Sequence, residues 1–137
     1  MEFTLDIAKK IAEACEKKAR QMGIPMVVAI VDAGGNAVLV ERMDGAMLAG
    51  VQIAQDKAYT AAATGFDTHQ IAQISQPGQI AYGLANTDRG RIVIFGGGIV
   101  LKQGQKTVGG VGASGGLANQ DQEVAQAGAD AFAKSEK

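Results

Sequence analysis

The sequence predicts an α+β fold in which helices pack on an antiparallel sheet of about five strands, giving α-β-α layers. The first observation behind this prediction is the helical spacing of apolar residues at both ends of the chain. The second is that strand-like runs come as adjacent pairs joined by glycine-containing turns. No helical crossover separates the members of a pair, which disfavours a parallel sheet. The length of 137 residues suits a single domain spanning residues 1–137.

The first third of the chain predicts a helix followed by a β-hairpin. Small and apolar residues recur at steps of three and four up to Met22, with Thr4 as the N-cap and Gly23 as the stop. The positions that share the inward face are Leu5, Ala8, Ala12, Cys15, Ala19 and Met22. The runs Met26–Val31 and Ala37–Glu41 then form two strands joined by a glycine-rich turn.

The middle of the chain predicts two further helices. The first covers residues 46–64 and is expected to be capped by Asp44, with small inward residues that allow close approach to the sheet. Its inward positions are Met47, Val51, Ala54, Ala58 and Ala61 or Ala62. A short helix follows, capped by Asp67 or Thr68 and ending at Ile74.

The last third predicts strands and a closing helix after an irregular connection over residues 79–90. Ile92–Phe95 is expected to be a buried strand, and Ile99–Leu101 pairs with Lys106–Val111 as a second hairpin. Gln120–Phe132 closes the chain as an amphipathic helix. The inward positions of that helix are Val124, Ala127, Ala131 and Phe132.

Composition excludes several classes of function. The net charge is −1 and aromatic residues make up 4% of the chain, so neither a basic footprint nor a stacking platform for nucleic acid is present. The longest apolar stretch, Ile92–Leu101, is interrupted by glycines and is too short to cross a membrane. Cys15 is the one cysteine and lies on a helix face that predicts a buried core thiol. With no signal peptide recognised, the expected location is the cytoplasm.

A glycine-rich segment over residues 110–115 fits G-x-G-x-x-G between a predicted strand and a predicted helix. A dinucleotide site would need a second parallel strand after that helix, and the remaining chain is too short for one. Two interpretations stay open. The glycines either expose backbone N–H groups that bind a carboxylate or phosphate, or they allow close packing. The candidate binding residues are Gly110, Gly112, Ser114 and Gly115.

Three further side chains are candidates for ligand binding. His69 is the only histidine, and one imidazole is enough to ligate a haem iron, although a solvent-facing histidine at a helix start is the plainer alternative. Arg42 lies beside a tight turn, where it either contacts a ligand or pairs with Asp44. Lys57 lies among small residues, so its ammonium group can be directed to a pocket or partner.

Five separated blocks of sequence together resemble the GlcG/HbpS-like family, also called DUF336. These blocks are Val31–Asn36, Arg42–Ala46, Asp56–Ala61, Phe95–Gly98 and Gly109–Gly116 followed by Asp121. The family includes haem-binding proteins and the C-terminal domain of PduO-type corrinoid adenosyltransferases. The resemblance implies a profilin-like domain that forms a homo-oligomer and binds haem or a related tetrapyrrole such as a corrinoid. One departure is Ala113, where many relatives have valine.

Two hypotheses for function follow. The first is a small-ligand-binding protein that takes haem or another tetrapyrrole, with His69 as the metal ligand, and acts as a carrier, sensor or accessory subunit in a metabolic operon. The second is an enzyme or enzyme-assembly subunit that acts on a small carboxylate or phosphate held at residues 110–115, with a link to corrinoid-dependent metabolism. Whether the protein is an enzyme is left open by the sequence.

Overall fold

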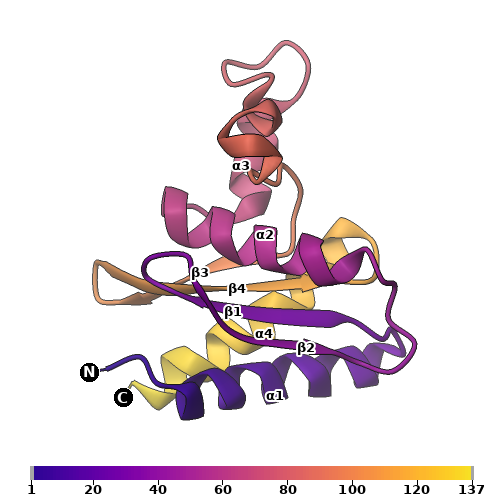
Figure 1. The fold of residues 1–137 in the computed structure, drawn as a ribbon, viewed down its shortest axis with the longest axis vertical. Helices are drawn as coiled ribbons and strands as arrows, with labels where there is room; N and C mark the ends of the chain where they lie inside the picture. Colours follow the sequence, from indigo (N-terminus) through magenta and orange to yellow (C-terminus); the bar gives the residue numbers. More distant parts are fainter. Residues whose placement is uncertain (1, 137) are drawn as a thin grey trace.

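Four antiparallel strands in the order β2-β1-β4-β3 form the centre of the computed structural model, which describes residues 2–136 (Figure 1). Along the chain the elements are α1 (Leu5–Met22), β1 (Val27–Asp32), β2 (Ala37–Arg42), α2 (Gly50–Thr64), α3 (Thr68–Ser75), η1 (Leu84–Asn86), η2 (Asp88–Gly90), β3 (Gly98–Gln103), β4 (Lys106–Ser114) and α4 (Ala118–Ser135). All three strand pairs are antiparallel, which confirms the predicted sheet type. The sheet has four strands rather than the five expected.

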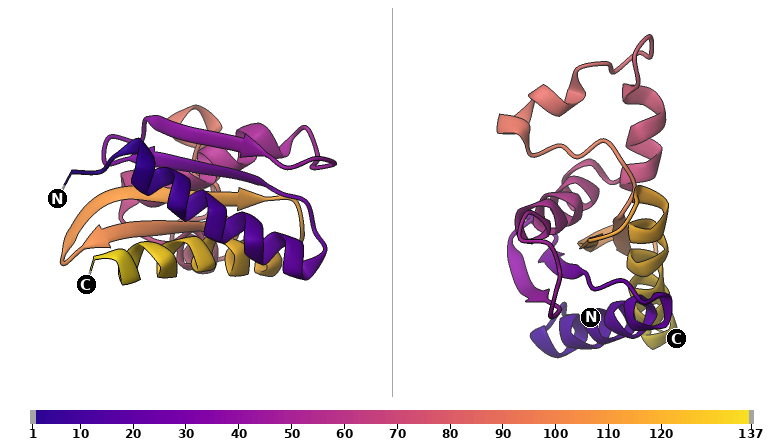
Figure 2. Two further views of the ribbon diagram at one scale, coloured as in Figure 1. Left: turned by 90° about the horizontal axis from the view of Figure 1, so that it is seen from below. Right: turned by 90° about the vertical axis from the view of Figure 1, so that its right-hand side faces the viewer.

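Helices cover both faces of this sheet. Helices α1 and α4 lie side by side on one face and α2 lies on the other (Figures 1 and 2). The side chains of β1 alternate accordingly, because Val28 and Ile30 belong to the core under α1 and α4, whereas Val27 and Ala29 belong to the core under α2. The predicted α-β-α layering is therefore confirmed.

The local signals at the N-terminal helix and first hairpin act as predicted. The Thr4 side chain accepts a hydrogen bond from the backbone N–H of Ile7 at 3.2 Å, and Gly23 ends α1 with a φ of 71°. In the turn between β1 and β2, the Asp32 carboxylate accepts hydrogen bonds from the backbone N–H groups of Gly34 and Asn36, both at 3.0 Å. These bonds fix the register of the hairpin.

Helix α2 lies unusually close to the sheet, because small residues face each other across the contact. Gly110 and Gly112 lie in β4, an inner strand that pairs with β1 and β3. A Cβ atom at Gly110 would overlap the carbonyl oxygen of Ala58, and one at Gly112 would overlap that of Ala54. The predicted strand Lys106–Val111 is therefore too short, because β4 continues to Ser114 and most of the glycine-rich segment belongs to it.

Three other sequence-based expectations are corrected. Ile92–Phe95 forms no strand, because the hydroxyl of Thr60 in α2 accepts the backbone N–H of Val93 at 3.0 Å and holds the segment against the helix. Helix α2 begins at Gly50, so Asp44 does not cap it. In consequence Met47 precedes the helix and is 57% exposed. In α4 the closest packing positions are Ala125 and Gly128 instead of Ala127 and Ala131.

The irregular connection predicted over residues 79–90 is present and includes the two short turns η1 and η2. Together with α3 it extends well beyond the layered body of the molecule (Figure 2). None of the residues of η1 and η2 is buried. Over residues 2–136, the helices are too short or too polar to cross a membrane.

Candidate functional site

A buried ion pair between Lys57 and Asp121 lies between α2 and the start of α4. The Lys57 ammonium donates a hydrogen bond to the Asp121 carboxylate at 2.7 Å and another to the carbonyl oxygen of Ala113 at 2.9 Å. The exposed fractions of the two side chains are 0% and 4%. The second oxygen of Asp121 accepts the backbone N–H of Gly116 at 2.8 Å. Burial lowers the pKa of Lys57, and the carboxylate of Asp121 opposes that shift.

The segment that precedes β3 passes directly over this ion pair. A Cβ atom at Gly97, whose φ is 128°, would come within 2.6 Å of the Lys57 ammonium nitrogen. The ring of Phe95 lies 5.2 Å from the same nitrogen and is half-exposed. Lys57 therefore joins α2, β4, α4 and the segment before β3, and a ligand cannot reach its ammonium group without local opening.

Sequence reasoning identified Lys57 but missed its partner. Asp121 follows Lys57 by 64 residues, so no local spacing connects the two. One signal was available, since Asp121 belongs to the sequence blocks that carry the family resemblance. The role of Lys57 in binding a ligand stays a prediction, whereas its role in joining four elements follows from its contacts.

The start of α3 is fixed to the edge strand β3. The Asp67 carboxylate accepts the backbone N–H of Val100 at 2.9 Å, and the Thr68 hydroxyl accepts the backbone N–H of Gly98 at 2.8 Å. Gln70 completes the start of the helix, because its side-chain oxygen accepts the backbone N–H of Asp67 at 2.9 Å. His69 lies between Thr68 and Gln70, so these bonds fix its backbone beside β3.

His69 is partly exposed and has an unpaired nitrogen. Its Nε2 atom lies 3.9 Å from the carboxylate of Asp67, which is too far for a hydrogen bond. Its Nδ1 atom is buried and has no hydrogen-bond partner among the described residues.

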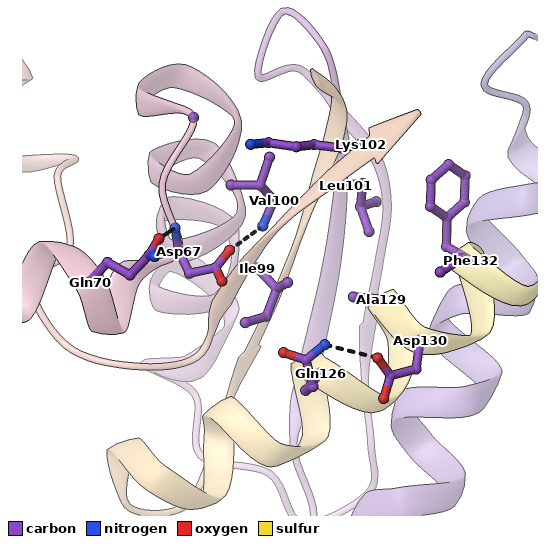
Figure 3. Close-up of a pocket in the computed structure, with 12 residues that line it drawn as sticks. Asp67, Gln70, Ile99, Val100, Leu101, Lys102, Gln126, Ala129, Asp130 and Phe132 are labelled. Carbon is purple, nitrogen blue, oxygen red and sulfur yellow. Dashed lines mark hydrogen bonds between the residues drawn. The ribbon is translucent and has the colours of Figure 1, made fainter. Parts of the chain in front are cut away.

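A cavity of about 390 Å³ lies beside this region, between the start of α3, β3 and α4 (Figure 3). Ile99, Leu101 and Phe132 contribute apolar surface to it. Its polar lining carries carboxylates from Asp67 and Asp130 together with other polar groups, shown as sticks in Figure 3. Gln126 and Asp130 are hydrogen-bonded to each other at 2.9 Å. The cavity has the volume of a small-molecule site, but His69 is not among the residues that line it.

Arg42 lies far from His69 across the sheet. It ends β2, which is one edge strand, whereas α3 is attached to β3, which is the other. Arg42 lines a shallow surface hollow with Glu16, Glu41 and other polar residues. The ion pairs among the described residues do not include an Arg42–Asp44 pair. A role for Arg42 in ligand binding stays a prediction, and such a site would be separate from His69.

The same hollow gives a prediction about pH. Burial, together with the neighbouring carboxyl group of Glu41, raises the pKa of Glu16 from 4.5 to about 7. Because folding raises this pKa, the native state holds the proton more tightly than the unfolded state. The contribution of Glu16 to stability is therefore present below pH 4.5 and is lost as the pH rises to about 7. In urea titrations at pH 5 and pH 8, we expect Glu16→Gln to lose less stability between the two values than the wild type does.

The exposed residue Asp6 in the same helix supplies the control for this measurement. Asp6→Asn removes one carboxyl group that is not among the neighbours that shift the pKa of Glu16, so it should keep the pH dependence of the wild type. An identical change between pH 5 and pH 8 in wild type and Glu16→Gln would contradict the assignment of this pH dependence to Glu16.

The remaining candidates from the glycine-rich segment lie in the layered body. Gly110 and Gly112 are paired within the sheet, and Ser114 is 4% exposed at the end of β4. A Cβ atom at Gly115 would lie 2.5 Å from the carbonyl oxygen of Pro25. The geometry gives these glycines a packing function, and binding of an anion by them stays a prediction. The structure therefore does not bring the predicted site residues together in one place.

The layered fold places the protein among small α+β domains with a four-stranded antiparallel sheet. Residues 3–130 match the family model described as haem degrading protein HbpS-like, and the chain belongs to this HbpS-like family. The match confirms the family resemblance seen in the sequence.

Three similar proteins give the family context. A 15.0 kDa protein of Citrobacter freundii, encoded between dhaT and dhaS, is 44% identical over 132 residues, which are 96% of this chain and 93% of that protein. The corrinoid adenosyltransferase PduO of Salmonella typhimurium is 39% identical over 117 residues, which are 85% of this chain and only 35% of the enzyme. A crystal structure of a PduOC complex with haem has a TM-score of 0.91 and 36% identity, and the match covers 96% of this chain and 95% of that one.

Proposed function

We propose that the protein binds haem and that His69 is the iron ligand. The observation that carries this proposal is the close similarity, over nearly the whole chain, to a structure solved as a complex with haem. The description of the family as HbpS-like haem degrading proteins supports the same ligand. With haem bound, the protein would act as a carrier, a sensor or an accessory subunit in a metabolic operon.

The residues around His69 fit a haem ligand in two respects. The imidazole is partly exposed and its Nδ1 atom has no hydrogen-bond partner within residues 2–136, but that atom is buried, so the side chain would have to rotate outwards to present it to an iron. Apolar side chains that would bury part of a macrocycle are also available, because Phe66, just before this helix, and Ile74, near its end, are exposed. Bound haem supplies a redox-active iron, and the residues of this chain would hold it and exclude water.

A haemin titration of the wild type and of His69→Ala tests the proposal. The wild type should bind haemin saturably with a shifted Soret band, and His69→Ala should bind 10- to 100-fold more weakly. That loss corresponds to about 1–3 kcal/mol, since burial of the macrocycle remains. Gln73→Ala changes an exposed residue of the same helix and should bind as the wild type does.

Two outcomes would contradict the proposal in different ways. Absence of saturable binding by the wild type would exclude haem as the ligand. Equal spectra and equal affinities for wild type and His69→Ala would keep haem but assign the iron to another residue.

A corrinoid is the second candidate ligand, because this chain matches part of a corrinoid adenosyltransferase. The same titration with cobalamin in place of haemin compares the two tetrapyrroles directly. An enzymatic role on a small carboxylate or phosphate stays a prediction, as does a location in the cytoplasm.

A further inference from the structure

The cavity between the start of α3, β3 and α4 offers a place for a ligand that the His69 region does not use, because His69 is not part of its lining. Its volume of about 390 Å³ suits a small organic molecule. Ile99, Leu101 and Phe132 form its apolar wall, and β3 passes along it as an edge strand. The polar groups around this wall decide which molecule fits.

The outer edge of β3 supplies the first of these polar groups. The backbone N–H of Ala113 donates to the carbonyl oxygen of Gly97 at 2.9 Å, so residues 97 and 99 are the ones that exchange hydrogen bonds with β4. Residues 98 and 100 direct their backbone groups away from β4, and their N–H groups are bound at the start of α3. The carbonyl oxygen of Val100 therefore lies on the outer edge, and Val100 lines the cavity.

Side chains add further hydrogen-bond acceptors to the cavity. Asp67 and Asp130 contribute carboxylates, which Figure 3 shows on either side of Ile99. The side-chain nitrogen of Gln126 donates to the Asp130 carboxylate at 2.9 Å. That bond leaves the side-chain oxygen of Gln126 as an acceptor for a ligand.

The charge of the lining favours a cation. Two carboxylates and the single ammonium group of Lys102 give the lining a net charge of −1. The ion pairs formed within residues 2–136 do not include Asp130, so no basic side chain neutralises its carboxylate there. Lys102 is exposed, so water and salt screen its charge.

We propose that this cavity binds a small primary amine with an apolar chain, as a function separate from haem binding. A protonated amine carries three N–H donors and no acceptor. Its head group therefore matches the carboxylates of Asp67 and Asp130 and the carbonyl oxygens of Val100 and Gln126. The chain of the amine would lie against the apolar wall, where its burial contributes to affinity.

An NMR titration with three ligands of the same shape tests the proposal. Isopentylamine, isopentanol and isovalerate share one apolar chain and differ in the head group. At neutral pH the amine is protonated, and it should bind saturably and shift the backbone amide signals of Val100 and Lys102. The alcohol and the carboxylate should bind at least about 10-fold more weakly, because neither carries a positive charge.

Variants of α4 identify the cavity as the site. Asp130→Asn keeps the size of an exposed side chain and removes its charge, so it should weaken the binding of isopentylamine roughly 10-fold. Ala133→Phe fills the cavity from an exposed position and should abolish binding. Glu123→Gln removes a carboxylate of the same helix that does not line the cavity, so it should bind as the wild type does. Circular dichroism should show the wild-type fold in all three.

Each other result overturns the proposal. Absence of saturable binding would exclude an amine, and equal affinities for isopentylamine and isopentanol would mean that the apolar wall binds without an ammonium site. Tighter binding of isovalerate would assign the cavity to a carboxylate held by Lys102. An unchanged affinity in Asp130→Asn would place the amine elsewhere. His69→Ala should bind isopentylamine as the wild type does, so a failure of haem binding leaves this proposal standing.

Discussion

Gly112→Val is expected to destabilise the fold by about 3 kcal/mol or more. Gly112 lies in the inner strand β4 and faces the backbone of α2. Its Cβ atom would overlap the carbonyl oxygen of Ala54 and would lie 2.8 Å from the backbone nitrogen of Ala58. Neither obstacle is a side chain that can rotate away, so the helix and the sheet would have to separate. The packing of α2 against the sheet would then be lost.

Urea denaturation of Gly112→Val beside Thr107→Val measures this effect. Thr107 lies in the same strand and is partly exposed, so valine there should change stability by less than about 0.5 kcal/mol. Gly112→Ala should fall between the two because it adds only the Cβ atom. A Gly112→Val protein with the wild-type midpoint would show that the close approach of α2 is not required.

Lys57→Met is expected to cost about 3–5 kcal/mol, because it leaves Asp121 buried without its cationic partner. The Asp121 carboxylate is 4% exposed and keeps only its bond from the Gly116 backbone. The carbonyl oxygen of Ala113 also loses its side-chain donor. Methionine has a length similar to that of lysine, so the loss reports the charge rather than a cavity.

Lys18→Met is the matched control, since Lys18 forms an exposed ion pair with Glu123 at 3.3 Å. Loss of a pair of that kind should change stability by less than about 1 kcal/mol. The double variant Lys57→Met/Asp121→Leu removes both buried charges and should recover part of the stability lost in Lys57→Met. A loss in Lys57→Met no larger than in Lys18→Met would contradict a stabilising role for the buried pair.

Elements with strong local signals were predictable from the sequence. The N-cap Thr4 and the left-handed Gly23 fix both ends of α1 by bonds within a few residues. The turn at Asp32 and the turn at Gly104 join strands that are neighbours in sequence and in space. Contacts between residues close in sequence determine such features, so short segments of sequence are enough to predict them.

Elements decided by tertiary contacts were not predictable in the same way. Ile92–Phe95 has the composition of a buried strand, yet the hydroxyl of Thr60, far away in sequence, binds the backbone of Val93 and keeps the segment out of the sheet. The sequence around Gly110 and Gly112 resembles a ligand-binding motif. Glycine is required at both positions because the backbone of α2 packs directly on them. The partner of Lys57 was missed for the same reason.

The candidate site was predictable only residue by residue. The residue types of His69 and Arg42 suggested ligand binding, but only the strand order shows that they lie at opposite edges of the sheet. Similarly, residues 79–90 were expected to be irregular, and no sequence pattern showed that Ile80 would be almost fully exposed.

The strand order also has a consequence for how the chain folds. Both hairpins are local, but the pairing of β1 with β4 joins Val27 to Ser114 across most of the sequence. Long-range pairing of this kind is slow because a large loop must close first. During synthesis, one edge of β1 therefore stays unpaired until β4 has left the ribosome. An unpaired strand edge makes the nascent protein prone to aggregation during this interval.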